Sequence, residues 1–388
     1  MKSIAIVVIA YNREKSLERL LNSIANARIE ENTVLIISID KSNNPLVEAC
    51  ARNYEWPFGE KRVVAHKENL GLKRHILGCG NYLDEFDAVV ILEDDLIVAE
   101  GFFEYSRKAV EFYSENDDIA GISLYSFHIN PHTGYPFFPS KNESDTFFIQ
   151  YAPSWGQVWM KKQWKAFISW YEKNQADVFD LPHLPINISH WGKNSWLKYH
   201  IKYAIENSKY FVYPYCAFSS TFSDVGVHAN LSYTYFQVVL QEGLIRNFKF
   251  PDLTHESVRY DCNFEREMIL QGYEDLCVDL WGTKGNRVKK RYWLTTLSLP
   301  YKVLKSYDLC LKPIENNIND FNKGNSIFLY DTKEKANKPV YSISTKWYIF
   351  DIHFTMLLLK DYGINLFFQE LFFYLKKKIS KILKWKNL

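Results

Sequence analysis

The chain has 388 residues, of which 47% are hydrophobic and 24% charged, and these ordinary globular values exclude a disordered or fibrous protein. The 47 Lys and Arg residues nearly balance the 45 Asp and Glu residues, so no global field favours nucleic acid as a partner. At about 150 residues per domain, the length predicts two domains, or one domain with an extension.

Apolar runs rich in β-branched residues alternate with helical patterns through the first third of the chain. Strands that are apolar throughout and alternate with helices are typical of a parallel sheet covered on both faces. We therefore predict an α/β fold with a mostly parallel, Rossmann-like sheet and helices on both faces. The expected strands are residues 4–9, 34–39, 62–65, 88–92 and 119–124, and the expected helices are residues 13–26, 45–53, 70–83 and 101–113.

Polar side chains follow three of these strands. Tyr11 and Arg13 come after the first strand, Asp40 after the second, and Glu93-Asp94-Asp95 after the fourth. The carboxyl ends of parallel strands meet at one edge, and ligands bind there at the point where the strand order reverses. No glycine-rich dinucleotide fingerprint and no P-loop is present, so those chemistries lose their support.

The three adjacent acids Glu93, Asp94 and Asp95 indicate a metal site. Adjacent carboxylates repel one another and raise one another's pKa. A hard cation such as Mn²⁺ or Mg²⁺ relieves this repulsion, because it binds carboxylate and phosphate oxygens together. Such a metal would also neutralise charge on a departing diphosphate. The alternative is an acidic loop that caps the helix beginning near Glu100.

These segments resemble a known fold. The N-terminal Ile-Val-Val-Ile-Ala-Tyr-Asn-Arg, Ser38-Ile39-Asp40, residues 71–75 and residues 93–105 resemble the glycosyltransferase-A fold. The likeness is to the N-acetylglucosaminyltransferase I family and to related bacterial family-2-like glycosyltransferases, and it covers residues 3–230 with gaps. It implies a metal-dependent transferase that takes a sugar from a nucleotide donor, with UDP-sugar expected.

The resemblance also implies roles for single residues on the donor side. Arg13 and Asp40 match nucleotide contacts of that family, with the aspartate reading the uracil edge, and His75 matches a nucleotide-contacting histidine. Taken alone, the three residues would be a charge at a helix start, a turn residue and a surface histidine. Tyr11 joins the expected donor-binding set.

The same resemblance divides the acidic motif between donor and metal. Glu93 and Asp94 would face the sugar and the ribose, and Asp95 would hold the metal. Trp155, beside Gly156, is similar to the family's Gly-Trp segment near the donor sugar. We expect Trp164, by contrast, to pack in the core.

The general base is not assigned by any motif. Inverting transfer needs a group that takes the proton of the acceptor hydroxyl, usually Asp or Glu. The family keeps an acid in a W-x-x-W-like segment, but residues 191–196 contain no carboxylate. The candidates that remain are Asp177, Asp180 and Asp224. His228 is a further candidate that would complete the metal shell or contact the diphosphate.

The last third of the chain is aromatic and basic, and we predict a C-terminal α+β extension over residues 246–388 after a catalytic domain over residues 1–245. Five cations lie between Lys284 and Arg291, where a solvated loop is the default, and RNA, a phosphate-bearing acceptor or a lipid headgroup are the alternatives. Residues 364–388 read as a basic amphipathic helix, which predicts contact with anionic headgroups at the inner membrane surface. Packing of that helix on the domain is the alternative.

The remaining features concern the compartment. The six cysteines match no zinc site or disulfide framework, which predicts reduced, buried thiols. The N-terminal apolar run is too short for a signal peptide, and no uncharged stretch approaches the ~20 residues of a spanning helix. We therefore expect a cytoplasmic protein that is peripheral on the inner face of the membrane.

We interpret the chain as an inverting glycosyltransferase that transfers a sugar to a growing glycan or lipid-linked acceptor. A sugar nucleotidyltransferase is the rival enzyme, although it would need a glycine-rich, basic loop after the first strand. The non-enzymatic rival is a catalytically inactive relative that binds glycan or organises a membrane assembly. The missing acid in residues 191–196 supports that rival.

Overall fold

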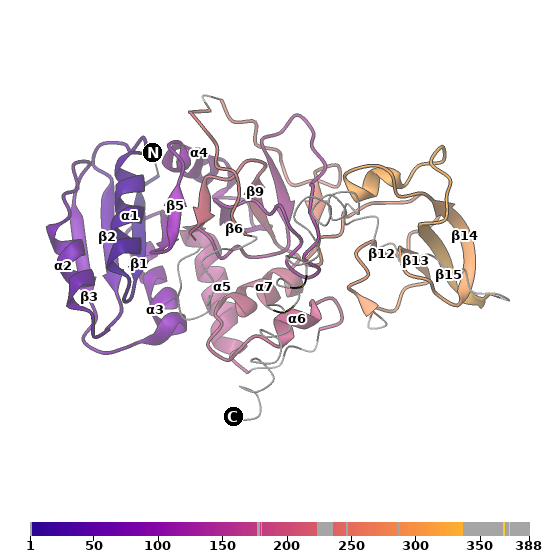
Figure 1. Cartoon of the computed structure of the whole chain (residues 1–388), viewed down its shortest axis with the longest axis horizontal. Coiled ribbons are helices and arrows are strands. Elements are labelled where there is room, and N and C mark those ends of the chain that lie inside the picture. Colours follow the sequence, from indigo (N-terminus) through magenta and orange to yellow (C-terminus); the bar gives the residue numbers. More distant parts are fainter. Residues whose placement is uncertain are drawn as a thin grey trace.

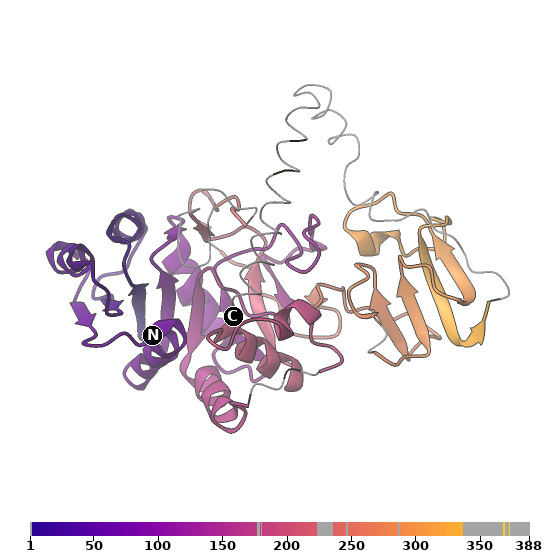
Figure 2. The same ribbon diagram turned by 60° about the horizontal axis from the view of Figure 1, so that its bottom comes forward.

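The computed structural model describes residues 2–176, 179, 181–222, 236–245, 247–285 and 288–336, together with Phe368 and Phe372. The described chain forms a nine-stranded sheet flanked by helices and a separate four-stranded sheet (Figure 1). Figure 2 shows the four-stranded sheet at one end of the molecule, beyond the edge of the larger sheet. The expected α/β fold with an additional C-terminal sheet region is confirmed.

The nine-stranded sheet contains most of the expected strands and several short ones. Its strands are β1 (Ile4–Ala10), β2 (Val34–Ile39), β3 (Lys61–Ala65), β4 (Ala88–Glu93), β6 (Ile119–Ser123), β7 (Thr146–Ile149), β8 (Gln157–Met160), β9 (Tyr210–Pro214) and β11 (Arg259–Tyr260). Its helices are α1 (Glu14–Ala25), α2 (Pro45–Asn53), α3 (Gly71–Cys79), α4 (Phe102–Tyr113), α5 (Lys161–Lys173), α6 (Ile186–Ser189) and α7 (Leu197–Glu206), with the 3-10 helix η1 (Gly80–Asp84) after α3. Strands β5 (Leu96–Val98) and β10 (Ser219–Thr221) pair as a small antiparallel sheet.

The strand order places the switch point of the sheet between β1 and β4. The order is β11-β7-β9-β6-β8-β4-β1-β2-β3, and β1 is parallel to both β2 and β4. The chain runs outward from β1 through β2 to β3, and then returns to the other side of β1 as β4. Residues that follow β1 and β4 therefore meet at the carboxyl edge where α/β proteins bind ligands.

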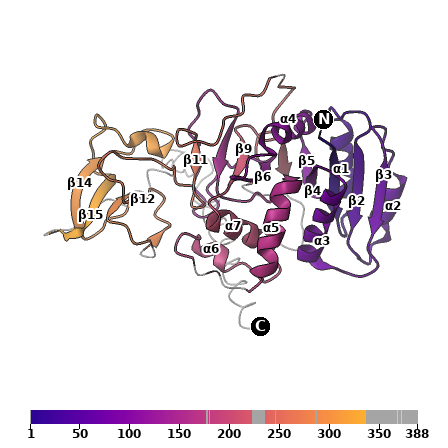
Figure 3. The ribbon, with the colours of Figure 1, turned by 180° about the vertical axis from the view of Figure 1, so that it is seen from behind.

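Each face of the sheet buries its own layer of helices. Ile4, Ile6 and Val8 of β1 pack with the apolar residues of α1, α2 and α4. Ala5 and Val7, one residue out of step, pack with α3, α5 and α7, which Figure 3 shows on that side of the sheet. This alternation explains why β1 is apolar at every position, because both of its faces are buried.

The second face carries a dense layer of rings between α5 and α7. Trp164 is buried and stacks on Trp159 with ring centroids 3.8 Å apart, as expected for a core residue. His200 of α7 stacks on Phe167 at 4.1 Å and meets the edge of Phe211 at 4.9 Å. Neither ring nitrogen of His200 has a hydrogen-bond partner among the described residues.

The four-stranded sheet comes after the nine-stranded sheet in the chain, and apolar side chains are buried on both of its faces. It has the order β12 (Leu276–Asp279), β13 (Tyr292–Thr295), β15 (Ile327–Lys335), β14 (Tyr301–Tyr307), and the 3-10 helix η3 (Ile314–Asn317) lies between β14 and β15. One face buries Leu280, Leu294 and Leu329, and the other buries Trp293 and Phe328. The two domains that we propose, 1–245 and 246–388, meet at the larger sheet, because β11 joins that sheet from beyond residue 245.

Lys284 departs from the expected solvated loop, because it is buried and forms an ion pair with Asp261. Lys290 pairs with Asp275 at 3.0 Å and Arg291 with Asp331 at 2.9 Å, but both side chains stay partly exposed to solvent. The expectation is corrected for Lys284 alone.

The structure bears on the expectations about the cysteines and about membrane-spanning helices. All six cysteines are free; Cys79, Cys262 and Cys277 are buried, whereas Cys310 is exposed. Within the described part of the chain, no helix is both long and apolar enough to cross a membrane. The basic amphipathic helix expected over residues 364–388 lies outside the described residues, apart from Phe368 and Phe372.

His200 should make the protein sensitive to acid. Burial lowers the pKa of His200 from 6.5 to about 3, so the folded protein holds a neutral imidazole that the unfolded chain protonates. The stabilisation is complete above pH 6.5 and is lost as the pH falls towards 3, by about 2 kcal/mol between neutral pH and pH 5. We expect His200→Phe to lose this part of the pH dependence, as measured by urea unfolding at both pH values.

The quantity compared is the change in the free energy of unfolding with pH. A constant change in stability caused by the larger ring therefore does not affect the comparison. His132, whose pKa burial lowers to about 4, supplies a background slope in both proteins. Equal slopes for wild type and His200→Phe would contradict the prediction.

Candidate functional site

Arg13, Asp94 and Asp95 meet at the switch point between β1 and β4. β1 pairs with β4 in the register Ile9 to Glu93, so the residues beyond each strand emerge side by side. The Arg13 guanidinium forms an ion pair with the Asp94 carboxylate and lies 3.2 Å from Asp95 Oδ2. The sequence therefore correctly predicted that an arginine and several acids would gather at this edge.

Burial and mutual repulsion shift the pKa values of the acidic motif upward. Burial, with help from Asp95 and Asp94, raises the pKa of Glu93 to about 8. Burial raises the pKa of Asp94 to about 6, although Arg13 opposes this shift. Near neutral pH, Glu93 is thus largely protonated and Asp94 ionised, and one guanidinium faces two carboxylates. The edge keeps a residual negative charge that favours a further cation.

Asp40 organises the start of α3. Its Oδ1 accepts hydrogen bonds from the backbone N–H groups of Lys41 at 2.9 Å and Leu70 at 2.7 Å, and its Oδ2 accepts one from Gly71 at 2.9 Å. Gly71 has φ +73°, a left-handed conformation that favours glycine. The motif at residues 71–75 is therefore fixed to the end of β2 by one buried carboxylate.

Behind Asp40, Ser38 joins two histidines. Its hydroxyl lies 2.7 Å from His75 Nε2 and 3.3 Å from His66 Nε2, and the two imidazoles meet edge to face at 5.1 Å. His75 is buried, so it is not the surface histidine of the alternative interpretation, and burial lowers its pKa to about 4. His66 was missed from the sequence, although it directly follows β3 and obeys the same strand-end rule.

Tyr11 and Trp155 flank the acidic motif. Tyr11 follows β1, and 37% of its surface is exposed. The antiparallel pairing of β8 with β4 sets Gln157 opposite Ile91, so Trp155 comes level with the end of β4 near Glu93. The Trp155 ring is half-buried and stacks on Phe236 at 4.9 Å. The backbone register thus brings both residues level with the strand ends at this edge, and their role in binding a donor remains a prediction.

The remaining candidates are not placed by the structure. Asp177, Asp180, Asp224 and His228 lie outside the described residues. In the part of the chain that is described, no group of three or more His, Cys, Asp or Glu side chains could hold a metal ion. Their assignment as bases or as a metal ligand remains a prediction.

The arrangement nevertheless fits a divalent cation in its chemistry. Asp95 offers hard carboxylate oxygens, its side chain is 28% exposed, and it lies beside a residual negative charge. A metal bound by so few protein oxygens would take the rest of its ligands from water or from phosphate. The edge can thus bind a phosphorylated ligand between Arg13, a metal at Asp95 and the aromatic rings.

Comparison with known proteins defines the class. Residues 5–155 match the family described as Glycosyl transferase family 2. The matched segment runs from β1 through β7 and contains Arg13, Asp40, His75 and the acidic motif. The match covers less than half of the chain, and it agrees with the predicted enzyme class. The match is to family 2, and the N-acetylglucosaminyltransferase I family is not confirmed. The sequence matches none of the curated proteins.

Several solved structures align with part of the chain. Staphylococcus aureus TarS 1-349 with UDP-GlcNAc is 15% identical, with 60% of this chain and 62% of that chain covered and a TM-score of 0.37. Mannosyltransferase PcManGT from Pyrobaculum calidifontis with GDP-Man and Mn²⁺ is 13% identical, with 42% of this chain and 45% of that chain covered and a TM-score of 0.30. GalNAc-T7 with UDP, GalNAc and Mn²⁺ is 12% identical, with 57% of this chain and 44% of that chain covered and a TM-score of 0.38. The alignments span about half of those chains, so the ligands named are properties of those proteins.

Removing the Arg13 guanidinium should destabilise the edge. We expect Arg13→Gln to lower the free energy of unfolding by about 2 kcal/mol, because the buried Asp94 carboxylate loses its charged partner. Millimolar Mn²⁺ should restore part of the loss by supplying a new cation. Thermal unfolding with and without Mn²⁺ measures both effects.

Arg52→Gln is the matched control, because its ion pair with Glu48 lies on the exposed face of α2. Such surface pairs contribute little to stability. If Arg13→Gln and Arg52→Gln unfold at the same temperature, the ion pair at the switch point does not stabilise the fold.

Proposed function

We propose that the chain is a metal-dependent glycosyltransferase that takes a sugar from a UDP-sugar. The observation that carries this proposal is the meeting of Arg13 with Asp94 and Asp95 at the switch point, within the segment that matches glycosyl transferase family 2. A diphosphate placed at this edge would meet a guanidinium and a metal-binding carboxylate together. That pairing suits phosphate recognition.

The nucleotide would bind along the ends of β1 and β2. The exposed ring of Tyr11 can stack on the base, and Asp40 has lone pairs beyond its three backbone hydrogen bonds to accept the uracil N3–H. His75 is buried and bonded to Ser38, so it would act by holding this strand end in place.

Transfer itself needs charge stabilisation and a base. A metal held at Asp95 would supply Lewis-acid stabilisation of the leaving diphosphate. Arg13 would bind the same phosphates, and Glu93 and Asp94 would face the sugar and ribose, with Trp155 beside them. Asp177, Asp180 and Asp224 remain the candidates for the base that deprotonates the acceptor hydroxyl, and His228 remains a candidate metal ligand. Direct displacement with one such base inverts the anomeric centre.

The acceptor in this proposal is a growing glycan or a lipid-linked glycan at the inner membrane surface. The basic C-terminal pattern of residues 364–388 supports contact with anionic lipid. Localisation to the cytoplasm, with peripheral attachment, belongs to the same proposal.

A non-catalytic relative is the second candidate, because residues 191–196 lack the expected acid. Such a protein would bind nucleotide, if at all, without turnover. A nucleotidyltransferase has less support, since Tyr11 to Arg13 does not form a glycine-rich loop.

Calorimetric titration with UDP and with GDP, each with and without Mn²⁺, tests the donor site. We expect UDP to bind only with the metal, because the diphosphate and Asp95 share its coordination sphere. Asp95→Asn should weaken UDP binding at least tenfold, since it removes an anionic metal ligand.

Asp84→Asn is the matched control, because Asp84 is an exposed aspartate on η1, away from the switch point. Hydrolysis of UDP-sugars by the wild type would then separate an enzyme from a non-catalytic relative. Failure of both nucleotides to bind under every condition would overturn the proposal.

A further inference from the structure

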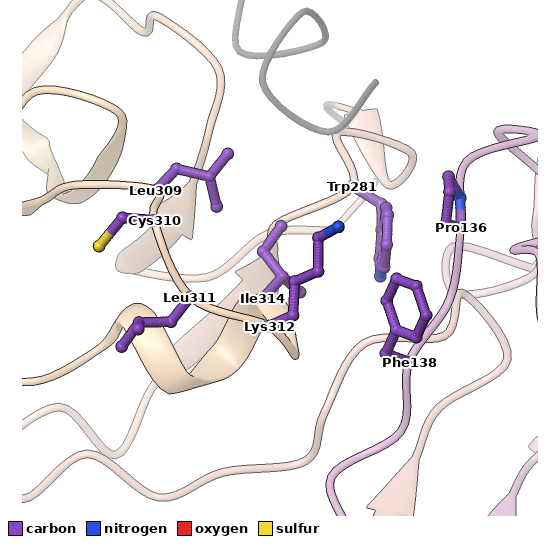
Figure 4. A pocket seen from close by; sticks show the side chains of 8 residues that line it. All are labelled: Pro136, Phe138, Trp281, Leu309, Cys310, Leu311, Lys312 and Ile314. Carbon is purple, nitrogen blue, oxygen red and sulfur yellow. The ribbon is translucent and has the colours of Figure 1, made fainter. Parts of the chain in front are cut away.

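A pocket lies between the two sheets, far along the strand order from the donor edge (Figure 4). One wall comes from the loop before β7 and the other from residues that follow β12 and β14. The pocket has a volume of about 120 Å³, somewhat smaller than the roughly 150 Å³ apolar cavity known to hold benzene. The lining residues used below are Phe138, Trp281, Leu309, Leu311, Lys312 and Ile314.

Buried hydrogen bonds hold the two walls in place. Glu315, next to Ile314 in η3, accepts hydrogen bonds from Ser140 Oγ at 2.6 Å and from Tyr260 Oη at 2.5 Å. Ser140 precedes β7, and Tyr260 belongs to β11 of the nine-stranded sheet. Trp281 Nε1 donates to the Phe264 carbonyl oxygen at 2.8 Å. The pocket is therefore formed before any ligand arrives, which lowers the entropy cost of binding.

The side chains that line the pocket are mostly apolar, Lys312 is the one charged residue among them, and the walls also expose polar atoms. The indole N–H of Trp281 is already used, and the leucine and isoleucine side chains offer no polar atom. Lys312 is exposed, its Nζ lies 5.2 Å from the Phe138 ring centroid, and it has no ion pair among the described residues. Figure 4 shows Lys312 and Ile314 between the aromatic pair and the leucines.

These side chains favour an amphiphile over a free sugar. The rings and aliphatic side chains offer a saccharide hydroxyl no hydrogen-bond partner, and an unpaired hydroxyl buried against them is costly. A hydrocarbon chain that packs on the same side chains gains from leaving water. The unpaired ammonium of Lys312 at the rim favours an anion at the end of that chain.

We propose that the pocket binds a hydrocarbon chain that carries a phosphate, with the chain between Phe138 and Trp281 and the phosphate on Lys312. The inference rests on the proposed function, because it identifies the lipid phosphate of the proposed acceptor as the ligand of this pocket. Four strand spacings of about 4.8 Å separate β7 from β4, so the phosphate would sit roughly 20 Å or more from the donor edge. A glycan attached to that phosphate would reach along the sheet edge.

The test uses the whole chain and titrates geranyl phosphate and decyl phosphate below their micelle concentrations, with geraniol and inorganic phosphate as controls. We expect both phosphates to bind more tightly than geraniol, and inorganic phosphate not to bind detectably. Lys312→Gln should weaken the amphiphiles about tenfold and leave geraniol unchanged. Phe138→Ala should weaken all three organic ligands. A preference for geranyl or decyl phosphate would identify an isoprenoid or straight-chain source.

Phe321→Ala is the matched control, because Phe321 is 88% exposed and does not line the pocket. Equal affinities in wild type, Lys312→Gln and Phe138→Ala would overturn the proposal, as would inorganic phosphate or a free sugar that competes fully with geranyl phosphate. UDP binding with Mn²⁺ is measured in the same proteins and should not change. If the wild type binds the amphiphiles but not UDP, that result counts against the donor site and not against the pocket.

Discussion

The parallel pairing of β1 with β4 is the constraint on which the candidate site depends. It brings Arg13 to Asp94 and Asp95, although more than eighty positions separate them in the sequence. Burial strengthens the need for this ion pair, because a carboxylate taken out of water is costly unless a cation lies close by. The guanidinium supplies one positive charge opposite the two aspartates. Such an acidic edge would attract a divalent cation, and that cation would in turn bind a diphosphate.

Much of this edge was predictable because it follows from two local rules. Apolar β-branched runs such as Val34–Ile39 form buried strands, and polar residues directly after parallel strands meet at one edge. Those rules found Arg13, Asp40 and the acidic motif. His66 obeys the same rule and was overlooked, because its meaning depends on the pairing of β3 beside β2, which sets it against Ser38 and His75.

Other features could not be predicted, because they depend on partners distant in the sequence. Lys284 belongs to a basic run that reads as solvated, yet it lies beside Asp261 and the buried acids Glu265 and Asp279. Similarly, β8 has only four residues, and nothing in Gln157–Met160 indicates an antiparallel strand at the middle of a parallel sheet. Short apolar segments do not declare their pairing direction.

The late position of β8 in the chain bears on how the protein is made. It lies between β4 and β6, and both of these strands leave the ribosome before it does. Until β8 arrives, the nascent chain holds two apolar strands with unpaired edges, which are ready templates for wrong pairing. The segment that matches family 2 ends at residue 155, just short of β8. A nascent chain that stalls there contains Arg13, Asp40, His75 and the acidic motif, but it lacks the strand that joins β4 to β6. Synthesis must run on into β8 before these two strands can belong to one sheet.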